Sequence, residues 1–164
     1  MTVTRTSTGT PTRRSGGDRL APLELGAWRE LLRVHATLTR ELDEELRRAH
    51  GLPLSSYDVL VNLESAPDRQ MRMSELANAV LLSRSGLTRL VERLERDGLL
   101  ARADCPDDAR GSLAVLTDEG MSRLAQARKT HLRGVRERFM DHFDDAELER
   151  LAEFWQRLLP PEPS

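Results

Sequence analysis

The chain has 164 residues, a formal net charge of −2, 38% hydrophobic residues and 32% charged residues. This balance suits a soluble, helix-rich protein and argues against a disordered one. No apolar run approaches the ~20 residues of a membrane span, and the N-terminus lacks the apolar core of a signal peptide, so we expect a cytoplasmic protein without a membrane partner. The one cysteine, Cys105, excludes an internal disulfide framework and a multi-cysteine zinc site.

The charge is unevenly distributed. Between Arg69 and Arg96 the sequence has six arginines and three glutamates. The overall charge is not that of a histone-like binder, but local distribution decides nucleic-acid binding. The middle of the chain is therefore basic within an acidic whole.

The N-terminal part is predicted to be a tail followed by a long helix. Residues 1–20 are rich in Thr, Ser, Gly and Arg, which predicts a disordered tail. From Leu23 to Ala49 apolar residues recur at spacings of three and four, which predicts a helix. A second helix is expected to start near Ser55, where Ser55 and Asp58 have the spacing of a capping box, and to end at Pro67.

Two short helices and a hairpin follow. Ser74 is expected to cap a helix from Glu75 to Val80, and Ser83 to cap one that runs to about Asp97. Two short strands are then predicted, Leu99–Ala103 and Ser112–Leu116, joined by a hairpin loop.

The C-terminal part is predicted to contain two further helices. Thr117 can cap a long helix whose apolar stripe runs from Met121 to Phe143. Asp144 and Glu147 have capping-box spacing at the start of the last helix, which Pro160 stops.

A helix, a tight turn, a second helix and a two-stranded hairpin are the order of elements in a winged helix-turn-helix. The major groove of DNA admits one α-helix, whose N-terminal end must carry small and polar residues. An arginine at the hairpin tip can enter an adjacent minor groove. The predicted DNA contacts are Ser83, Arg84, Ser85, Thr88, Arg89, Arg110 and Gly111.

The same stretch resembles the MarR family of regulators. The segment MSELANAVLLSRSGLTRLVERLERDGLL is similar to the family's helix-turn-helix, and CPDDARGSLAVLTDEG is similar to its wing and the entry to the next helix. The second segment contains an Asp-x-Arg, Asp108 to Arg110, and a Leu-Thr-x-x-Gly, Leu116 to Gly120. We expect Asp108 to hold Arg110 in place, because a carboxylate repels phosphate.

The resemblance implies a mainly α fold with a small β-hairpin wing. It implies one domain over residues 21–159, with a winged helix-turn-helix at about 54–117 and dimerisation helices at about 21–50 and 118–159. It also implies a homodimer on a pseudo-palindromic operator, and a ligand-responsive repressor whose small-molecule effector binds between the dimer helices and the DNA-binding lobe. The candidate ligand-binding residues are Trp28, His35 and His131.

Several alternatives stay open or are disfavoured. The arginines of the second short helix can instead form a solvated face paired with Glu92 and Glu95, and the chain can be a helical protein-interaction dimer without DNA binding. Redox switching at Cys105 is disfavoured by neighbouring aspartates. Zinc binding by His131 and His142 is disfavoured because eleven helical residues span ~16 Å. No spacing indicates an enzyme, a cofactor or a metal site.

Overall fold

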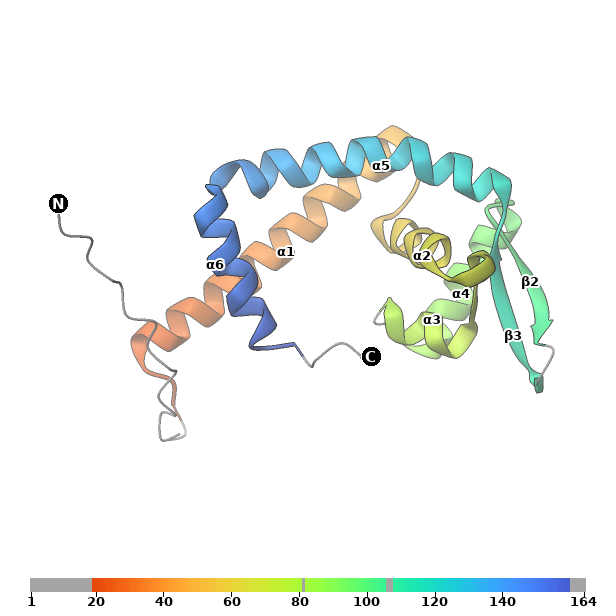
Figure 1. The fold of residues 1–164 in the computed structure, drawn as a ribbon, viewed down its shortest axis with the longest axis horizontal. Coiled ribbons are helices and arrows are strands. Elements are labelled where there is room, and N and C mark those ends of the chain that lie inside the picture. Colours follow the sequence, from red (N-terminus) through yellow and green to blue (C-terminus); the bar gives the residue numbers. More distant parts are fainter. Residues whose placement is uncertain (1–18, 81, 106–107, 160–164) are drawn as a thin grey trace. The chain divides into compact units, whose positions relative to one another are not determined.

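The computed structural model describes residues 19–80, 82–105 and 108–159, with only the backbone described at 108–110. Residues 1–18 of the predicted tail therefore lie outside the described residues. The chain divides into two compact units, residues 1–36 and 37–164, and each is described by itself. The helices are α1 (Pro22–His50), α2 (Leu54–Ser65), α3 (Met73–Ala79), α4 (Arg84–Arg96), α5 (Asp118–Arg138) and α6 (Asp145–Gln156) (Figure 1).

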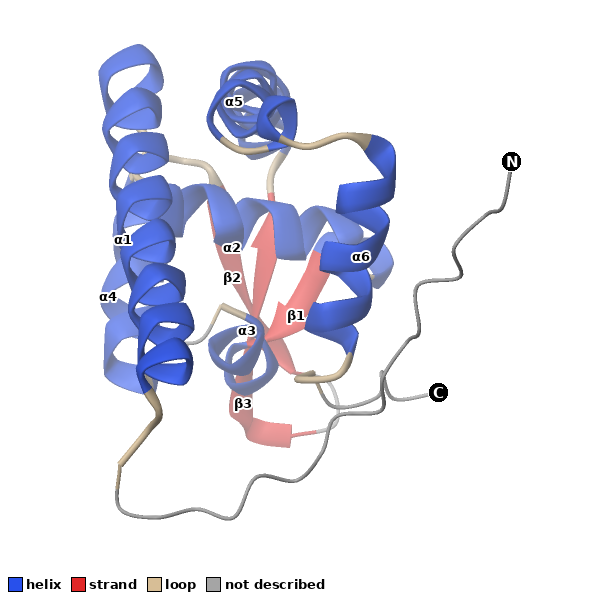
Figure 2. Ribbon diagram, turned by 90° about the vertical axis from the view of Figure 1, so that its left-hand side faces the viewer, coloured by secondary structure: helices blue, strands red, loops and turns tan. Residues whose placement is uncertain are grey.

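Three antiparallel strands form one small sheet, in the order β1 (Gln70–Arg72), β3 (Asp108–Leu116), β2 (Leu100–Cys105) (Figure 2). The predicted hairpin is confirmed, but its strands are longer than predicted, because β2 extends to Cys105 and β3 begins at Asp108. Strand β1 was not predicted. It has only three residues, follows the short 3-10 turn Pro67–Arg69 and pairs Met71 with Ala114, a partner far along the chain. So short a segment carries no period of its own.

Three of the predicted helix caps are confirmed. The Ser83 hydroxyl accepts a hydrogen bond from the Gly86 amide at 3.1 Å. The Thr117 hydroxyl accepts one from the Gly120 amide at 3.0 Å, and the Asp144 carboxylate accepts one from the amide of Glu147 at 2.8 Å. These side chains satisfy amides that have no partner within their helices.

Two predicted caps are wrong. Helix α2 begins at Leu54, near the predicted position, but Pro53 is its N-cap residue and the Ser55 hydroxyl does not cap it; the first amide of the helix donates to the Asp43 carboxylate of α1 at 2.8 Å. Helix α3 begins at Met73, with Arg72 as its N-cap residue and Ser74 inside the helix. In both places tertiary structure fixes the helix start. A side chain of another helix binds the first amide of α2, and β1 leads directly into α3.

The core lies among α2, α3, α4, α5 and the base of the sheet. Its largest fully buried side chains include Leu46, Leu60, Leu63, Leu76, Leu87, Leu94, Leu100 and Leu124. On α4 the predicted stripe is confirmed, because Leu87, Leu90, Val91 and Leu94 are all buried. Burial of a leucine side chain contributes roughly 2 kcal/mol of transfer free energy, so this stripe anchors α4 on the body.

The predicted stripe of the fifth helix is only partly right. Helix α5 ends at Arg138 and is followed by a short 3-10 turn, Met140–His142, so the helix does not reach Phe143. Leu132 is 56% exposed. The buried face of α5 is instead made of Gly120, Leu124, Ala127, Thr130 and Gly134. Three of these five are glycine or alanine, which allows neighbouring elements to approach closely.

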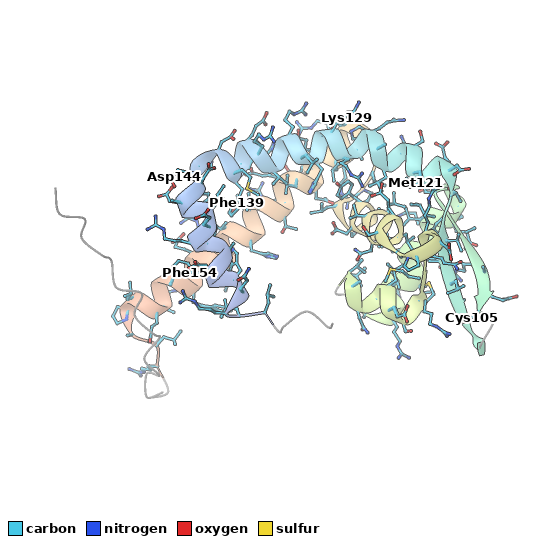
Figure 3. All side chains as sticks on the ribbon, in the orientation of Figure 1. Cys105, Met121, Lys129, Phe139, Asp144 and Phe154 are labelled. Carbon is cyan, nitrogen blue, oxygen red and sulfur yellow. The ribbon has the colours of Figure 1, made fainter. Side chains whose placement is uncertain are left out.

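Helix α6 has an apolar face that the single chain leaves uncovered. None of its residues is buried. Phe154, labelled in Figure 3, is 50% exposed, and Leu158, just after the helix, is 72% exposed. Within residues 19–36, Leu23 and Trp28 are likewise 75% and 52% exposed. Exposed apolar residues in such numbers are typical of surfaces that meet another molecule.

Candidate nucleic-acid interface

Helices α3 and α4 form the helix-turn-helix. Helix α3 ends at Ala79, and the Leu82 amide returns to the carbonyl of Ala77 at 3.0 Å. Helix α4 then starts at Arg84 with its apolar face buried against the core. Its other faces carry polar and charged side chains, which are exposed at Arg84, Ser85, Arg89, Glu92, Arg93 and Arg96. The second helix is thus anchored along one face and free along the other.

The N-terminal turn of α4 is polar and small. The hydroxyl of Ser83 lies 3.3 Å from that of Ser85, and the hydroxyl of Thr88 donates to the Arg84 carbonyl at 2.9 Å. Gly86 adds no side chain, and a Cβ there would lie 3.1 Å from the Ser83 hydroxyl. A backbone phosphate of DNA can therefore approach this end closely, where the helix dipole is positive.

The glutamates of α4 are paired with the wing rather than with the arginines of their own helix. Arg102 on β2 places its guanidinium 3.8 Å from the carboxylate of Glu92 and 3.4 Å from that of Glu95. Among the residues that the structure describes, Arg84 and Arg89 have no carboxylate partner. The alternative in which Glu92 and Glu95 neutralise the α4 arginines is therefore not what the structure adopts.

The wing consists of β2 and β3. Its backbone is regular from the pair Leu100–Leu116 to Asp104–Ser112, and the register shifts before Cys105 pairs with Asp108. The side chains of Asp108 and Arg110 lie outside the described residues, so the expectation that one holds the other stays a prediction.

A groove of about 370 Å³ joins the helix-turn-helix to the wing. Its walls come from the start of α3, the start of α4 and the middle of β3: Arg72, Met73, Ser74, Arg84, Leu87, Thr88, Gly111 and Ser112. Three predicted DNA contacts, Arg84, Thr88 and Gly111, thus line one groove. Arg72 and Ser74 were not predicted there, because only the pairing of β1 with β3 brings the start of α3 beside the wing.

Comparisons with known proteins agree with this geometry. The model of the MarR family matches residues 50–111. The chain is 35% identical to Sco3205, a MarR family transcriptional regulator from Streptomyces coelicolor solved in complex with DNA, with a TM-score of 0.81 over 89% of this chain and 94% of that one. It is 34% identical to AbsC, a MarR family regulator from the same organism, with a TM-score of 0.79 over 85% and 94% of the two chains.

The chain belongs to the MarR family. Its fold is mainly α with a small β-hairpin wing, as expected, and the unpredicted strand β1 makes the sheet three-stranded. The match to the transcriptional regulator PrsX of Escherichia coli has 32% identity over 56% of this chain and 57% of PrsX. The match to the transcriptional repressor YetL of Bacillus subtilis has 30% identity over 66% of each chain. The matched region thus spans little more than half of PrsX and about two thirds of YetL.

Of the candidate ligand-binding residues, His131 lines a cavity in this MarR-family chain. Its ring packs on that of Tyr57 with centroids 4.5 Å apart. The cavity, about 410 Å³, is bounded by α2, the end of α3 and α5, with Asp58 and Asn62 among its polar walls. Burial lowers the pKa of His131, and raises the pKa of both Tyr57 and Asp58. Trp28 and His35 belong to the other unit, where both are exposed.

Cys105 and the potential metal ligands are the remaining candidate groups. Cys105, at the end of β2 (Figure 3), is 6% exposed. In the described part of the chain, no three His, Cys, Asp or Glu side chains gather as a metal site would require. The same residues contain no helix long and apolar enough to cross a membrane.

Proposed function

We propose that this MarR-family chain is a sequence-specific transcriptional regulator that places α4 in the major groove of duplex DNA. The observation that carries the proposal is the charge arrangement on α4. Arg102 engages Glu92 and Glu95, and this leaves Arg84 and Arg89 exposed without a carboxylate partner among the described residues. Free guanidinium groups on an anchored helix are suited to phosphate and to guanine.

Each predicted contact has a role in this proposal. The α4 amides beyond the Ser83 cap, together with Arg84 and Ser85, meet a backbone phosphate. Thr88 and Arg89 lie about one turn further along and reach base edges, where arginine pairs with guanine. Gly111 lets the wing approach the DNA closely, while Arg110, held by Asp108, enters the minor groove.

The chain is proposed to act as a homodimer. The uncovered apolar residues of α6 and of the first part of α1 support this, because a second copy would bury them. The dimerisation helices are then residues 21–50 and 118–159, around a winged helix-turn-helix at 54–117. Two copies of α4 would read a pseudo-palindrome with half-sites ~34 Å apart or a multiple of that distance.

Repression would follow from occupancy of a promoter, and release from a small-molecule effector. YetL is described as a repressor, and we extend that activity to this chain as part of the proposal. The cavity beside His131 is the proposed effector site. The other two candidate ligand-binding residues, Trp28 and His35, stay predictions. The effector must bind the DNA-free conformation more tightly than the DNA-bound one, because otherwise it does not shift the equilibrium between them. Because the proposed target is chromosomal DNA, the proposal includes a cytoplasmic location.

Footprinting on the DNA upstream of the chain's own gene tests the proposal. The expected result is one protected site with two symmetric halves, bound by two protomers, and loss of transcription from that promoter when the protein is present. A chain that forms a stable dimer but protects no DNA from a genomic library would instead be a protein-interaction dimer, and would overturn the proposal.

A further inference from the structure

A separate cavity of about 460 Å³ lies on the body of the molecule, away from the groove and from the His131 cavity. It is formed where the end of α1, the start of α2, the last turn of α4 and the start of α5 meet. None of its lining residues lines either of the other two cavities. Its charged and polar walls are Arg47, His50, Ser56, Arg93, Asp97 and Arg123.

The lining of this cavity is strongly basic. Arg47, Arg93 and Arg123 come from three different helices, and Asp97 is the one acidic side chain among the lining residues. Arg47 is already neutralised by Asp43 on its own helix. The other two guanidinium groups have no carboxylate within ion-pair distance in the described part of the chain. Cations from α4 and α5 thus line one space and outnumber its single carboxylate, Asp97.

Arg93 and Arg123 both line the cavity, Arg93 with an exposed side chain and Arg123 with a partly buried one. The guanidinium of Arg93 donates to the hydroxyl of Ser56 at 3.3 Å, and Ser56 is fully buried. The Nε atom of Arg123 is buried and has no hydrogen-bond acceptor among the described residues. Buried N–H groups in native proteins nearly always have a partner. The Nε atom itself is closed to solvent, so a ligand in the cavity would contact Arg123 through the outer nitrogens of its guanidinium.

We propose that this cavity binds a small phosphate dianion, either inorganic phosphate or a phosphomonoester. Guanidinium groups match phosphate oxygens in charge and in paired hydrogen-bond geometry. With Asp97 counted, the two unpaired arginines still leave the lining positive, and phosphate offers them more acceptor oxygens than a carboxylate does. The cavity is larger than phosphate alone requires, so it also has room for the organic part of a small phosphorylated metabolite, with His50 at its edge.

A backbone phosphate of DNA could also bind these arginines. The test therefore distinguishes a small phosphate ligand from the DNA backbone. The full chain in a phosphate-free, low-salt buffer is titrated with inorganic phosphate and followed by calorimetry and thermal unfolding. We expect saturable binding, a higher midpoint of unfolding, and affinity weakened by about tenfold or more in R123Q. The matched control is R136Q, which neutralises an exposed arginine on the same helix and should bind phosphate like the parent chain.

Circular dichroism of R123Q establishes that it folds, and R123K, which keeps the charge but not the planar fork, should bind phosphate with intermediate affinity. Operator affinity measured in the same phosphate-free buffer forms the second arm. Phosphate binding lost in R123Q with operator affinity unchanged supports the proposal. Absence of phosphate binding by the parent chain overturns it, as does an R123Q variant that binds phosphate normally but loses operator affinity. That last result would assign Arg123 to the DNA backbone.

Discussion

A Cβ atom on Gly120 would lie 2.0 Å from the carbonyl oxygen of Leu99. Two hydrogen bonds hold the same junction. The Thr117 hydroxyl donates to the Gly98 carbonyl at 2.7 Å, and the Thr117 amide donates to the Leu99 carbonyl at 3.3 Å. The first turn of α5 is therefore fixed against the segment that joins α4 to β2. This contact ties the proposed dimerisation helix to the DNA-binding lobe.

We expect G120A to destabilise the protein by about 3 kcal/mol or more, because the clash is with backbone and cannot be relieved by a side-chain rotation. Urea unfolding measures the change. The control is G26A, since Gly26 is exposed within α1 with nothing within 4 Å of an added Cβ, and alanine there should stabilise by up to about 1 kcal/mol. Equal stability of G120A and the parent chain would show that this junction is not as described.

Gly134 is also buried, but we expect its substitution by alanine to change stability little. The three nearest atoms to an added Cβ would be the side-chain tips of Arg138, Glu45 and Leu42, at 2.8–2.9 Å. The Arg138 and Glu45 tips form one ion pair at 2.7 Å and must shift together to admit the methyl group. Alanine gains about 1 kcal/mol of helix propensity over glycine, which offsets part of that cost. We therefore expect G134A to lie within about 1 kcal/mol of the parent chain in the same urea experiment. A loss as large as that of G120A would contradict this reading.

Glu45 should make stability depend on acid pH. Hydrogen bonding from Arg133, with the charges of Arg138 and Arg133, holds the pKa of this carboxyl below its ordinary value of 4.5 despite partial burial. Because the folded-state pKa is the lower one, the stabilisation is complete above pH 4.5 and is lost as pH falls through the folded-state pKa. We expect E45Q to lose about 1–3 kcal/mol at neutral pH and to show a flatter decline of stability below pH 4.5.

Thermal unfolding between pH 3 and 7 measures this dependence. E149Q serves as the control, since Glu149 is exposed on α6 and its change should leave the pH profile of the parent chain intact. If E45Q and the parent chain lose stability in parallel on acidification, the ion pairs of Glu45 with Arg133 and Arg138 do not contribute in solution.

The start of α2 provides a direct comparison of two candidate caps. The Asp43 carboxylate accepts a hydrogen bond from the Leu54 amide and forms an ion pair with Arg47. D43A should therefore lower the free energy of unfolding by about 1–2 kcal/mol. S55A should cost less than about 0.5 kcal/mol, since the hydroxyl of Ser55 caps nothing in the structure. Chemical denaturation of both variants measures the difference. The reverse order would restore the local capping box that the sequence predicts.

The sequence predicts well those features that depend on neighbours within one helical turn. The caps at Ser83, Thr117 and Asp144 and the buried stripe of α4 are of this kind, because helical periodicity and cap chemistry are local. The site's charge arrangement is not local. The pairing of Arg102 with Glu92 and Glu95 depends on how β2 packs beside α4, and no spacing in the sequence specifies that packing.

The same limit explains the other differences. Asp43 is 11 residues from the amide it binds, and β1 is defined only by its pairing with β3. The walls of the His131 cavity and the free Nε of Arg123 also arise from helices that meet in three dimensions. The sequence thus predicts the helix proposed to contact DNA, whereas the groups that position it and the additional cavities emerge only from the fold.

The most direct measurement of the central claim is operator binding by Arg89 variants across a salt titration. The parent chain should prefer its operator to unrelated duplex DNA, with affinity falling steeply as salt increases. R89A should lose about 1–3 kcal/mol of operator affinity and most of that preference, while R136A should leave the preference unchanged. Binding by R89A with the full preference of the parent chain, or binding by the parent chain that is indifferent to salt, would contradict the account.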